Sequence, residues 1–271
     1  MSIKTLVEDA RFLQTNGRPL GALTILMLAI AGSSRKLFPK GIAKSIRYPK
    51  DFMRDEECFC LFLGGRLNKI FCGDLGGPDA AECNIVLKFK GKDITLAEVL
   101  YKYYRNGLIH QAELPNDVEF TPVKKTGSDN HGASISLGDV LVLDHGWIDI
   151  LIDVVVNAKC NYEIFDTYQP ELKANHGIIP EEHLAFTVEK FNITPICYKL
   201  LRHGLGFILD AYGSKEAVPD MSESFSRLFD GRKLRVAGIS ALHGFGLTDK
   251  RGKLTSKGIA VINTINECYH I

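Results

Sequence analysis

Arg105, Asn106 and His110 are the residues of this chain whose types and spacing best suit chemistry. They lie in an aromatic-rich segment, residues 101–111, in which the histidine follows the arginine by five positions. An imidazole that titrates near neutral pH can accept the proton of a 2′-hydroxyl group. A guanidinium group can bind the neighbouring phosphate and stabilise the charge that builds up on it in the transition state. The pair therefore suits metal-free cleavage of RNA.

Neighbouring residues could assist this chemistry. Asn106 could hold a phosphate through its amide group, and Tyr101 and Tyr104 could stack on or hydrogen-bond to an unpaired base. We therefore predict Arg105, His110 and Asn106 as catalytic, and the two tyrosines as substrate-binding. A purely structural interpretation stays open, in which Arg105 pairs with a carboxylate, His110 caps a helix and the tyrosines only fill space.

Helix geometry limits how Arg105 and His110 could act together. Each residue of an ideal α-helix turns by about 100°, so two residues five positions apart lie about 140° apart around the axis. One intact α-helix does not place them side by side. We expect either a helix end near Gly107 or a two-fold dimer to bring the two side chains to one cleft.

The pattern Arg105-Asn106-x3-His110, preceded by Leu100 and Tyr101 and followed by a polar loop, resembles the Arg-polar-x3-His motif of HEPN domains. The resemblance covers roughly residues 1–168. It implies an all-helical domain that dimerises, with the motifs of both subunits at a shared cleft, and often a metal-independent ribonuclease. By analogy it suggests a toxin or phage-defence effector. Domains of this family also serve as non-catalytic binding or dimerisation modules.

The composition describes a folded protein with no global preference for a charged partner. The 271 residues suffice for two domains, and 33 Lys and Arg balance 32 Asp and Glu. The seven cysteines are odd in number and lack paired metal-ligand spacing, and the other histidines are scattered. We expect free thiols, a cytoplasmic location, no metal and no cofactor.

The most apolar segment, residues 20–30, is about half as long as a membrane span requires. Acidic and basic side chains precede it, which does not fit a signal peptide. We expect a buried core helix, no export and no membrane partner.

Periodicity predicts a mainly α fold whose first domain, residues 1–170, is a helical bundle with a small β insertion. Thr95 and Glu98 have the spacing of a capping box, so the motif helix should begin at Leu96 and bury a stripe that includes Leu100 and Tyr103. The other expected elements are helices over residues 3–13, 18–31, 51–71 and 147–158, a strand over 84–90 and a hairpin or capped loop over 135–143.

Residues 171–192, rich in turn formers, are predicted to be a linker to a second α+β domain, residues 193–271. Its expected helices cover residues 195–211, 222–229, 232–242 and 259–265. The run from Gly246 to Gly258, Gly-Leu-x4-Gly-x-Leu-Thr-x2-Gly, resembles the wing and last helix of winged helix-turn-helix domains.

This second domain is the expected contact with nucleic acid. Residues 221–260 contain eight basic and three acidic side chains, a local net charge of +5. In a winged helix the second short helix, here 232–242, enters a groove, and the turn of the wing, here a basic turn between two short strands over 246–255, touches the nucleic-acid backbone. The predicted nucleic-acid-binding residues are therefore Arg232, Lys233 and Arg235 on that helix, and Lys250, Arg251 and Lys253 at the turn as phosphate contacts.

The leading hypothesis is thus a homodimeric RNA endonuclease with RNA, and also DNA through the second domain, as partners. The alternative is a non-catalytic DNA-binding regulator whose bundle only dimerises or senses a ligand. A winged-helix fold that makes protein contacts also stays open.

Overall fold

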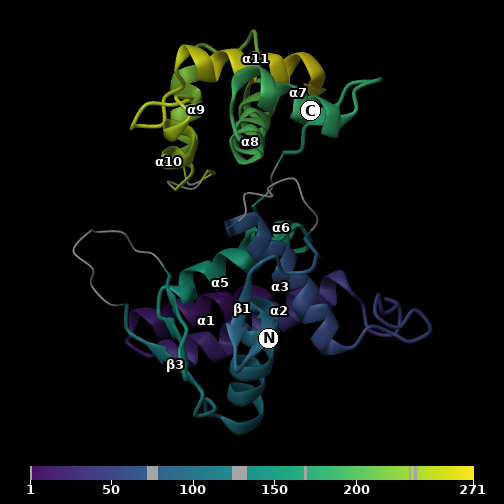
Figure 1. The fold of residues 1–271 in the computed structure, drawn as a ribbon, viewed down its shortest axis with the longest axis vertical. Coiled ribbons are helices and arrows are strands. Elements are labelled where there is room, and N and C mark those ends of the chain that lie inside the picture. The colour runs from purple at the N-terminus through teal and green to yellow at the C-terminus, as the bar shows by residue number, and fades with distance from the viewer. Residues whose placement is uncertain (1, 72–78, 124–132, 168–169, 232, 235–236) are drawn as a thin grey trace. The chain divides into compact units, whose positions relative to one another are not determined.

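The computed structural model describes residues 2–71, 79–123, 133–167, 170–231, 233–234 and 237–271. The fold is mainly helical, with small sheets (Figure 1). It separates into two compact units, the first formed by Met1–Ile70 and Pro78–Tyr168 and the second mainly by Gln169–Ile271. Each unit has a hydrophobic core of its own.

The first unit is built on long helices that the sequence predicts well. Its helical elements are α1 (Ile3–Thr15), α2 (Pro19–Leu37), α3 (Asp55–Phe71), α4 (Leu96–Val99), η1 (Leu100–Arg105), η2 (Gly107–Gln111), α5 (Trp147–Val156), η3 (Lys159–Asn161) and α6 (Tyr162–Phe165). The expected start of the motif helix is confirmed. Thr95 Oγ1 accepts from the Glu98 N–H at 3.2 Å, and Glu98 Oε2 accepts from the Thr95 N–H at 3.0 Å.

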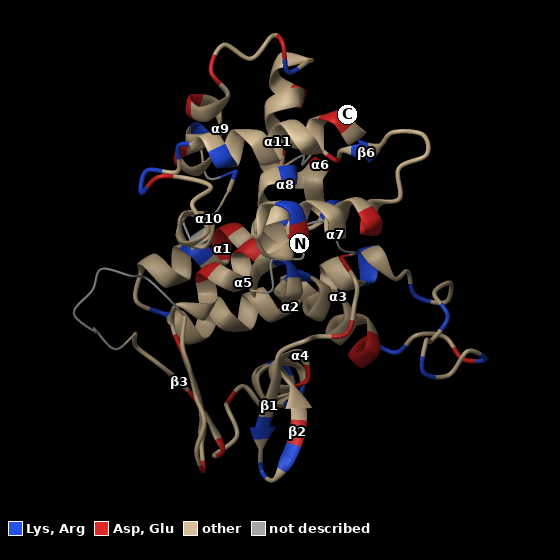
Figure 2. Cartoon of the chain, turned by 45° about the horizontal axis from the view of Figure 1, so that its top comes forward, with Lys and Arg blue, Asp and Glu red and all other residues tan. Residues whose placement is uncertain are grey.

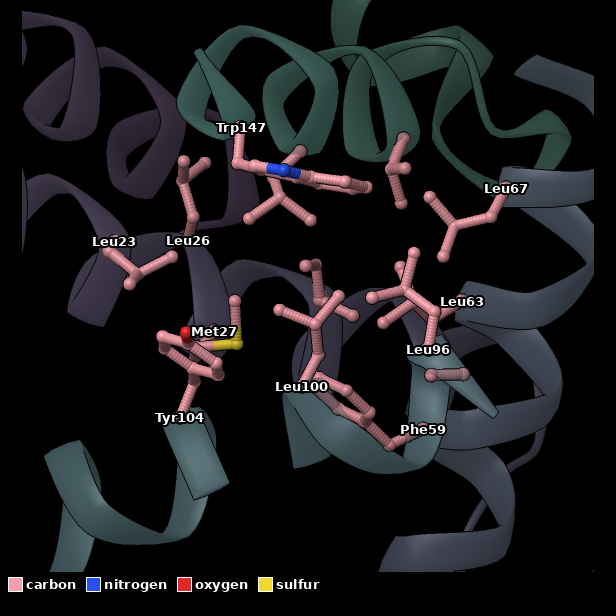
Figure 3. Packing of buried hydrophobic residues seen from close by; sticks show 14 of the residues in the cluster. Leu23, Leu26, Met27, Phe59, Leu63, Leu67, Leu96, Leu100, Tyr104 and Trp147 are labelled. Atoms are coloured by element: carbon pink, nitrogen blue, oxygen red, sulfur yellow. The ribbon is translucent and has the colours of Figure 1, made fainter. Parts of the chain in front are cut away.

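The core of the first unit lies where α2, α3, the motif helix and α5 meet, as Figure 3 shows. Trp147 of α5 and Met27 of α2 are almost completely buried there, together with Leu100 and Tyr104 of the motif helix. Each large apolar side chain buried in this way stabilises the fold by about 1.5–3 kcal/mol. The predicted stripe is confirmed at Leu100. Tyr103 is only partly buried against the same cluster, and Tyr104 is the fully buried tyrosine.

Helix α2 extends to Leu37, six residues beyond the predicted end at residue 31. It is the one described helix that is long and apolar enough to cross a membrane by length and composition, with a mean hydropathy of 1.3. Its buried side chains include Leu23, Leu26 and Ile30. Because these side chains belong to the cluster shared with α1 and α5, α2 is the expected core helix of this unit.

Two glycines in α3 allow another segment to approach the helix closely. A Cβ on Gly64 would lie 2.5 Å from the Ala81 carbonyl oxygen, and one on Gly65 would lie 2.6 Å from the Asp79 carbonyl oxygen. The glycines therefore serve packing, and α3 is one continuous helix that begins at Asp55 rather than at residue 51.

Among the residues that the structure describes, two small sheets complete the first unit. The hairpin of β1 (Val86–Phe89) and β2 (Lys92–Thr95) leads directly into α4. In the other sheet, β5 (Leu141–Asp144) lies between the parallel strand β3 (Val118–Thr121) and the antiparallel strand β4 (Ile135–Ser136). Of the two expected alternatives, a hairpin or a capped loop, the antiparallel β4–β5 pair forms the hairpin. The polar composition around β3 concealed that strand.

The second unit is arranged around a long central helix, α8 (Pro195–Tyr212), which contacts the other helices of the unit. These are α7 (Pro180–Phe191), α9 (Met221–Asp230), α10 (Ala237–Gly244) and α11 (Ser256–Cys268), with the strand pair β6 (Lys173–Ala174) and β7 (Tyr269–His270).

The segment 171–192, expected to be a linker, instead contains β6 and α7. Pro180 suggested a break, but it stands in the first turn of α7, where proline is well tolerated. Leu172 and Thr187 of this segment are buried in the second unit. The expected linker is therefore part of that unit's fold.

Candidate functional site

The Arg105–His110 segment is wound as a π-helix, which brings the two side chains together. Elements η1 and η2 both have this winding, and the N–H of Asn106 donates to the carbonyl of Tyr101, five residues earlier. A π-helix bonds residue i to residue i+5, and such turns are frequent at functional sites. Arg105 Nη1 lies 3.2 Å from His110 Nε2 within one chain. The angle of about 140° that an α-helix would place between the two residues therefore does not apply. The contact needs no second subunit.

Gly107 permits a tight turn after this segment. A Cβ at residue 107 would lie 2.8 Å from the Glu113 carbonyl oxygen and 2.9 Å from Pro115 Cδ. Ala112 then ends η2 with a left-handed φ of 59°. The chain thus folds back directly onto Gly107, between the two candidate catalytic residues, and any larger residue there would push the turn away.

Tyr104 fixes the inner face of the same segment. Its hydroxyl donates to the Glu119 carbonyl at 2.9 Å and lies 3.4 Å from the Leu141 carbonyl, which ties the π-helix to β3 and β5. Burial raises the pKa of this hydroxyl. Because the side chain is fully buried, the predicted substrate contact by Tyr104 does not fit the structure, and Tyr104 is an anchor of the site.

Arg105 is the centre of the polar contacts. Its Nη1 donates to Asn106 Oδ1 at 2.8 Å as well as to His110 Nε2, and its Cζ lies 5.2 Å from the centre of the Tyr101 ring. Its Nε is buried and has no hydrogen-bond partner among the residues described. Since a guanidinium only donates, His110 Nε2 accepts, so in this arrangement the imidazole is neutral with its proton on Nδ1.

The side chains of the site differ in accessibility. His110 is exposed, whereas Tyr101, Arg105 and Asn106 are half-buried. Burial raises the pKa of the Tyr101 hydroxyl, and the neighbouring Arg105 charge opposes that rise. Solvent or a substrate can therefore reach the imidazole directly, while the guanidinium stays oriented by its neighbours.

A pocket of about 130 Å³ lies beside Tyr101 and Arg105. Sequence reasoning missed its second cation, Arg35, at the end of α2. Arg35 Nε donates to Asp55 Oδ1 at 2.7 Å, and its Nη1 donates to the Met53 carbonyl at 3.3 Å. Nothing in the sequence indicates this proximity, because α2 and the motif helix are distant along the chain. The remaining lining residues are Ala31, Ser34 and Phe59.

The predicted nucleic-acid-binding residues of the second unit are only partly placed. Arg232 and Arg235 lie outside the residues described. Helix α10 begins at Ala237 rather than at residue 232, so Lys233 precedes it, with its Nζ 5.5 Å from the centre of the Phe207 ring. Lys233 is thus not on the helix that was expected to enter a groove.

The expected basic turn is present between Thr248 and Leu254, which form an isolated antiparallel bridge rather than two strands. Lys250 and Arg251 are exposed at this turn. Lys253 Nζ lies 2.6 Å from Glu223 Oε2, which raises the pKa of the Lys253 ammonium group. One of the three predicted phosphate contacts is therefore already paired with a carboxylate.

The histidine of the second unit with the most enclosed setting is His183 of α7. Its Nδ1 lies 2.8 Å from the Tyr198 hydroxyl, which in turn donates to the Tyr269 hydroxyl at 3.2 Å. Burial lowers the pKa of His183. Within the described parts of the chain, His, Cys, Asp and Glu side chains form no group of three that could hold a metal ion.

Comparison with curated proteins and with solved structures finds no significant match. One family model, described as Rv1289, matches residues 2–182. The match covers the whole first unit, including the Arg105–His110 segment, and extends into α7. Since it spans well over half of the chain, this protein belongs to the Rv1289 family.

Proposed function

We propose that this protein is a metal-independent RNA endonuclease whose catalytic pair is Arg105 and His110. The observation that carries the proposal is the 3.2 Å contact between Arg105 Nη1 and His110 Nε2 at an accessible position of a π-helix. The resemblance of the first unit to HEPN domains, and of the second to winged helices, is part of the same proposal.

In the proposed reaction, His110 Nε2 accepts the proton of a ribose 2′-hydroxyl. The 2′-oxygen attacks the adjacent phosphorus and the bond to the 5′-oxygen breaks, which leaves a 2′,3′-cyclic phosphate. Solvent supplies the proton to the departing 5′-oxygen, since the site is open at His110. Arg105 donates hydrogen bonds to the phosphate oxygens and stabilises the charge that accumulates on them.

Substrate binding would also free His110 to act as the general base. Without substrate, the Nε2 lone pair of His110 accepts from Arg105. A phosphate attracts the guanidinium more strongly than a neutral imidazole does, because it carries a negative charge and can accept two parallel hydrogen bonds from the guanidinium. The phosphate would thereby take over the Arg105 donors and free Nε2 for the 2′-hydroxyl. Tyr101 would stack on a base beside the site.

The contact is made within one chain, so we propose a site that each protomer completes by itself. A homodimer that brings two such sites to one cleft remains part of the proposal, as does the analogy with toxins and defence effectors. The role of the dimer would then be to hold the RNA rather than to assemble the pair.

DNA binding by the second unit is a second candidate function. It is favoured by Lys250 and Arg251, which are exposed on the turn next to α11. Two observations weaken it: α10 contains no Lys or Arg within its bounds, and Lys253 is paired with Glu223. Binding to duplex DNA that weakens steeply with salt, and further on replacing Lys250 and Arg251, would support the regulator instead.

The direct test is cleavage of a labelled single-stranded RNA in EDTA by the wild type, His110→Ala and Arg105→Gln. We expect each site variant to cleave about 10²–10⁴-fold more slowly, as removal of a general base or an oxyanion ligand does. His176→Ala, at an exposed position of the second unit, is the matched control and should cleave like the wild type. Equal rates for the wild type and His110→Ala, or no cleavage by the wild type, would reject the proposal.

A further inference from the structure

The loop between α2 and α3, residues 39–54 and here called the 39–54 loop, projects away from the helices (Figure 1). It exposes several large apolar side chains close together, whereas the surface of a folded protein normally exposes such side chains singly. Ile42 is 73% exposed, Ile46 69%, Tyr48 59% and Phe52 52%. Single exposed apolar residues are ordinary, but several on one short segment indicate an interaction surface.

The same loop is strongly basic. It contains five Lys or Arg residues and one acidic residue, and Figure 2 shows their positions along the projecting segment. Lys44, Arg47 and Lys50 are exposed between the apolar side chains. Lys44 Nζ lies 4.1 Å from the centre of the Phe52 ring, so cationic and apolar groups share one surface.

This exposure is held in place by the fold. Lys44 and Phe52 form an antiparallel bridge, flanked by a hydrogen bond from the Ser45 N–H to the Asp51 carbonyl at 3.0 Å. The buried Glu57 carboxylate of α3 accepts the N–H groups of Ile46 at 2.7 Å and of residue 47 at 3.2 Å. The loop is thus a braced hairpin that presents its side chains outward.

We propose that the 39–54 loop is a docking site for the surface of a membrane that contains anionic phospholipids. Isoleucine, tyrosine and phenylalanine side chains can enter the boundary between headgroups and acyl chains, and the neighbouring Lys and Arg pair with anionic headgroups. Such a membrane surface would contact both the exposed apolar side chains and the basic side chains of the loop. The proposal is independent of the proposed nuclease activity.

Charge and chemistry favour lipid over the other partners. A second copy of the loop would bring two strongly positive surfaces together, which is unfavourable. Single-stranded RNA would use the cations and the aromatic rings but would leave Ile42 and Ile46 without apolar partners. The expectation of no membrane partner concerned only spanning helices and whole-chain charge, neither of which detects a local docking loop.

The test is co-sedimentation of the full chain with vesicles of phosphatidylcholine alone or with about one third phosphatidylserine. We expect binding only to the anionic vesicles, with weakening at high salt. Lys44→Gln/Arg47→Gln/Lys50→Gln should lower the affinity about 10–100-fold, and Ile42→Ser/Ile46→Ser about 10-fold or more. Matched controls elsewhere in the first unit, Lys88→Gln/Lys92→Gln and Leu137→Ser, should bind like the wild type.

Thermal unfolding checks that all variants fold, which is expected because every replaced side chain is exposed. The proposal is overturned if the wild type ignores anionic vesicles, or if the controls lose as much affinity as the loop variants. It is also overturned if the loop variants lose binding to a single-stranded oligonucleotide but keep vesicle binding, which would assign the surface to RNA. Cleavage by the same variants is scored separately, so failure of one proposal is distinguishable from failure of the other.

Discussion

His110 in the first unit and His183 in the second both contact a polar side chain, yet their surroundings suit opposite roles. His110 is exposed, and its Nε2 faces the half-buried Arg105 guanidinium. His183 is buried, and its Nδ1 contacts the Tyr198 hydroxyl, which in turn donates a hydrogen bond to the Tyr269 hydroxyl. A histidine suits catalysis when its partner can be exchanged for a substrate, and suits structure when its partners are fixed.

The largest expected effect separates these two roles. His110→Ala should lower RNA cleavage about 10²–10⁴-fold and change the free energy of unfolding by less than about 0.5 kcal/mol, as expected for an exposed site. His183→Ala should lower the free energy of unfolding and leave the cleavage rate of the folded protein unchanged. It leaves a buried cavity and removes a partner of the Tyr198 hydroxyl, which costs about 1–3 kcal/mol, while the folded fraction still cleaves RNA.

Urea unfolding and cleavage rates measured on the same preparations check this prediction. A stability loss in His110→Ala as large as that in His183→Ala would show that both histidines are structural.

Gly107 offers the next largest effect, because it lies between the two residues of the pair. Gly107→Ala places a Cβ against the Glu113 carbonyl and Pro115, and we expect a loss of about 1–3 kcal/mol together with slower cleavage. Gly32→Ala, in α2, is the matched control. Its nearest neighbour, Ile3 Cγ1, would lie at 3.5 Å, so the replacement should be neutral or stabilise the helix by up to about 1 kcal/mol. Unchanged stability of Gly107→Ala would contradict the close packing of Gly107 against Glu113 and Pro115.

A smaller effect is expected from Tyr104, which anchors the same segment. Tyr104→Phe removes the donor to the Glu119 carbonyl and should cost about 1 kcal/mol without changing the cleavage rate. Tyr101→Phe, which keeps the ring beside Arg105, should cost less than about 0.5 kcal/mol. Thermal unfolding of both variants measures the difference. A cleavage defect in Tyr104→Phe at full stability would restore Tyr104 to the substrate-binding residues.

The smallest effect concerns the pH dependence of stability. Burial lowers the pKa of His183, an effect that the Arg202 charge reinforces and a backbone contact with Thr264 opposes. As the pH falls through about 6.5, the unfolded chain takes up a proton at this residue before the folded chain does. The second unit should therefore be most stable above this pH and lose stability below it. Urea unfolding at several pH values should show a flatter dependence for His183→Gln, and an unchanged slope would count against the buried neutral histidine.

The sequence predicts the elements that local chemistry controls. The capping box of Thr95 and Glu98 predicts where α4 begins, and Pro19 predicts where α2 begins. The alternation of apolar and polar residues favours the β4–β5 hairpin. These features need only neighbouring residues to form. The mainly helical fold class could be predicted for the same reason.

Features that depend on distant contacts were missed. Tyr104 ties the π-helical segment to β3 and β5, and the turn at Pro115 packs against Gly107. These contacts cannot be predicted from neighbouring residues. The sequence therefore suggests an α-helix, in which the pairing of Arg105 with His110 would require a dimer or a helix end. Arg35 reaches the site only through the packing of α2. Likewise, the fold of 171–192 depends on burial against α8 and α11, which its turn-forming composition concealed.

Whether one chain completes the site is tested most directly by mixing inactive variants. Arg105→Gln and His110→Ala are each purified, mixed, allowed to exchange subunits and assayed for RNA cleavage in EDTA beside the wild type. We expect that the wild type cleaves and that the mixture stays as inactive as either variant, because no protomer then holds both side chains. Restored cleavage in the mixture would contradict it, since the pair would then be assembled between two subunits.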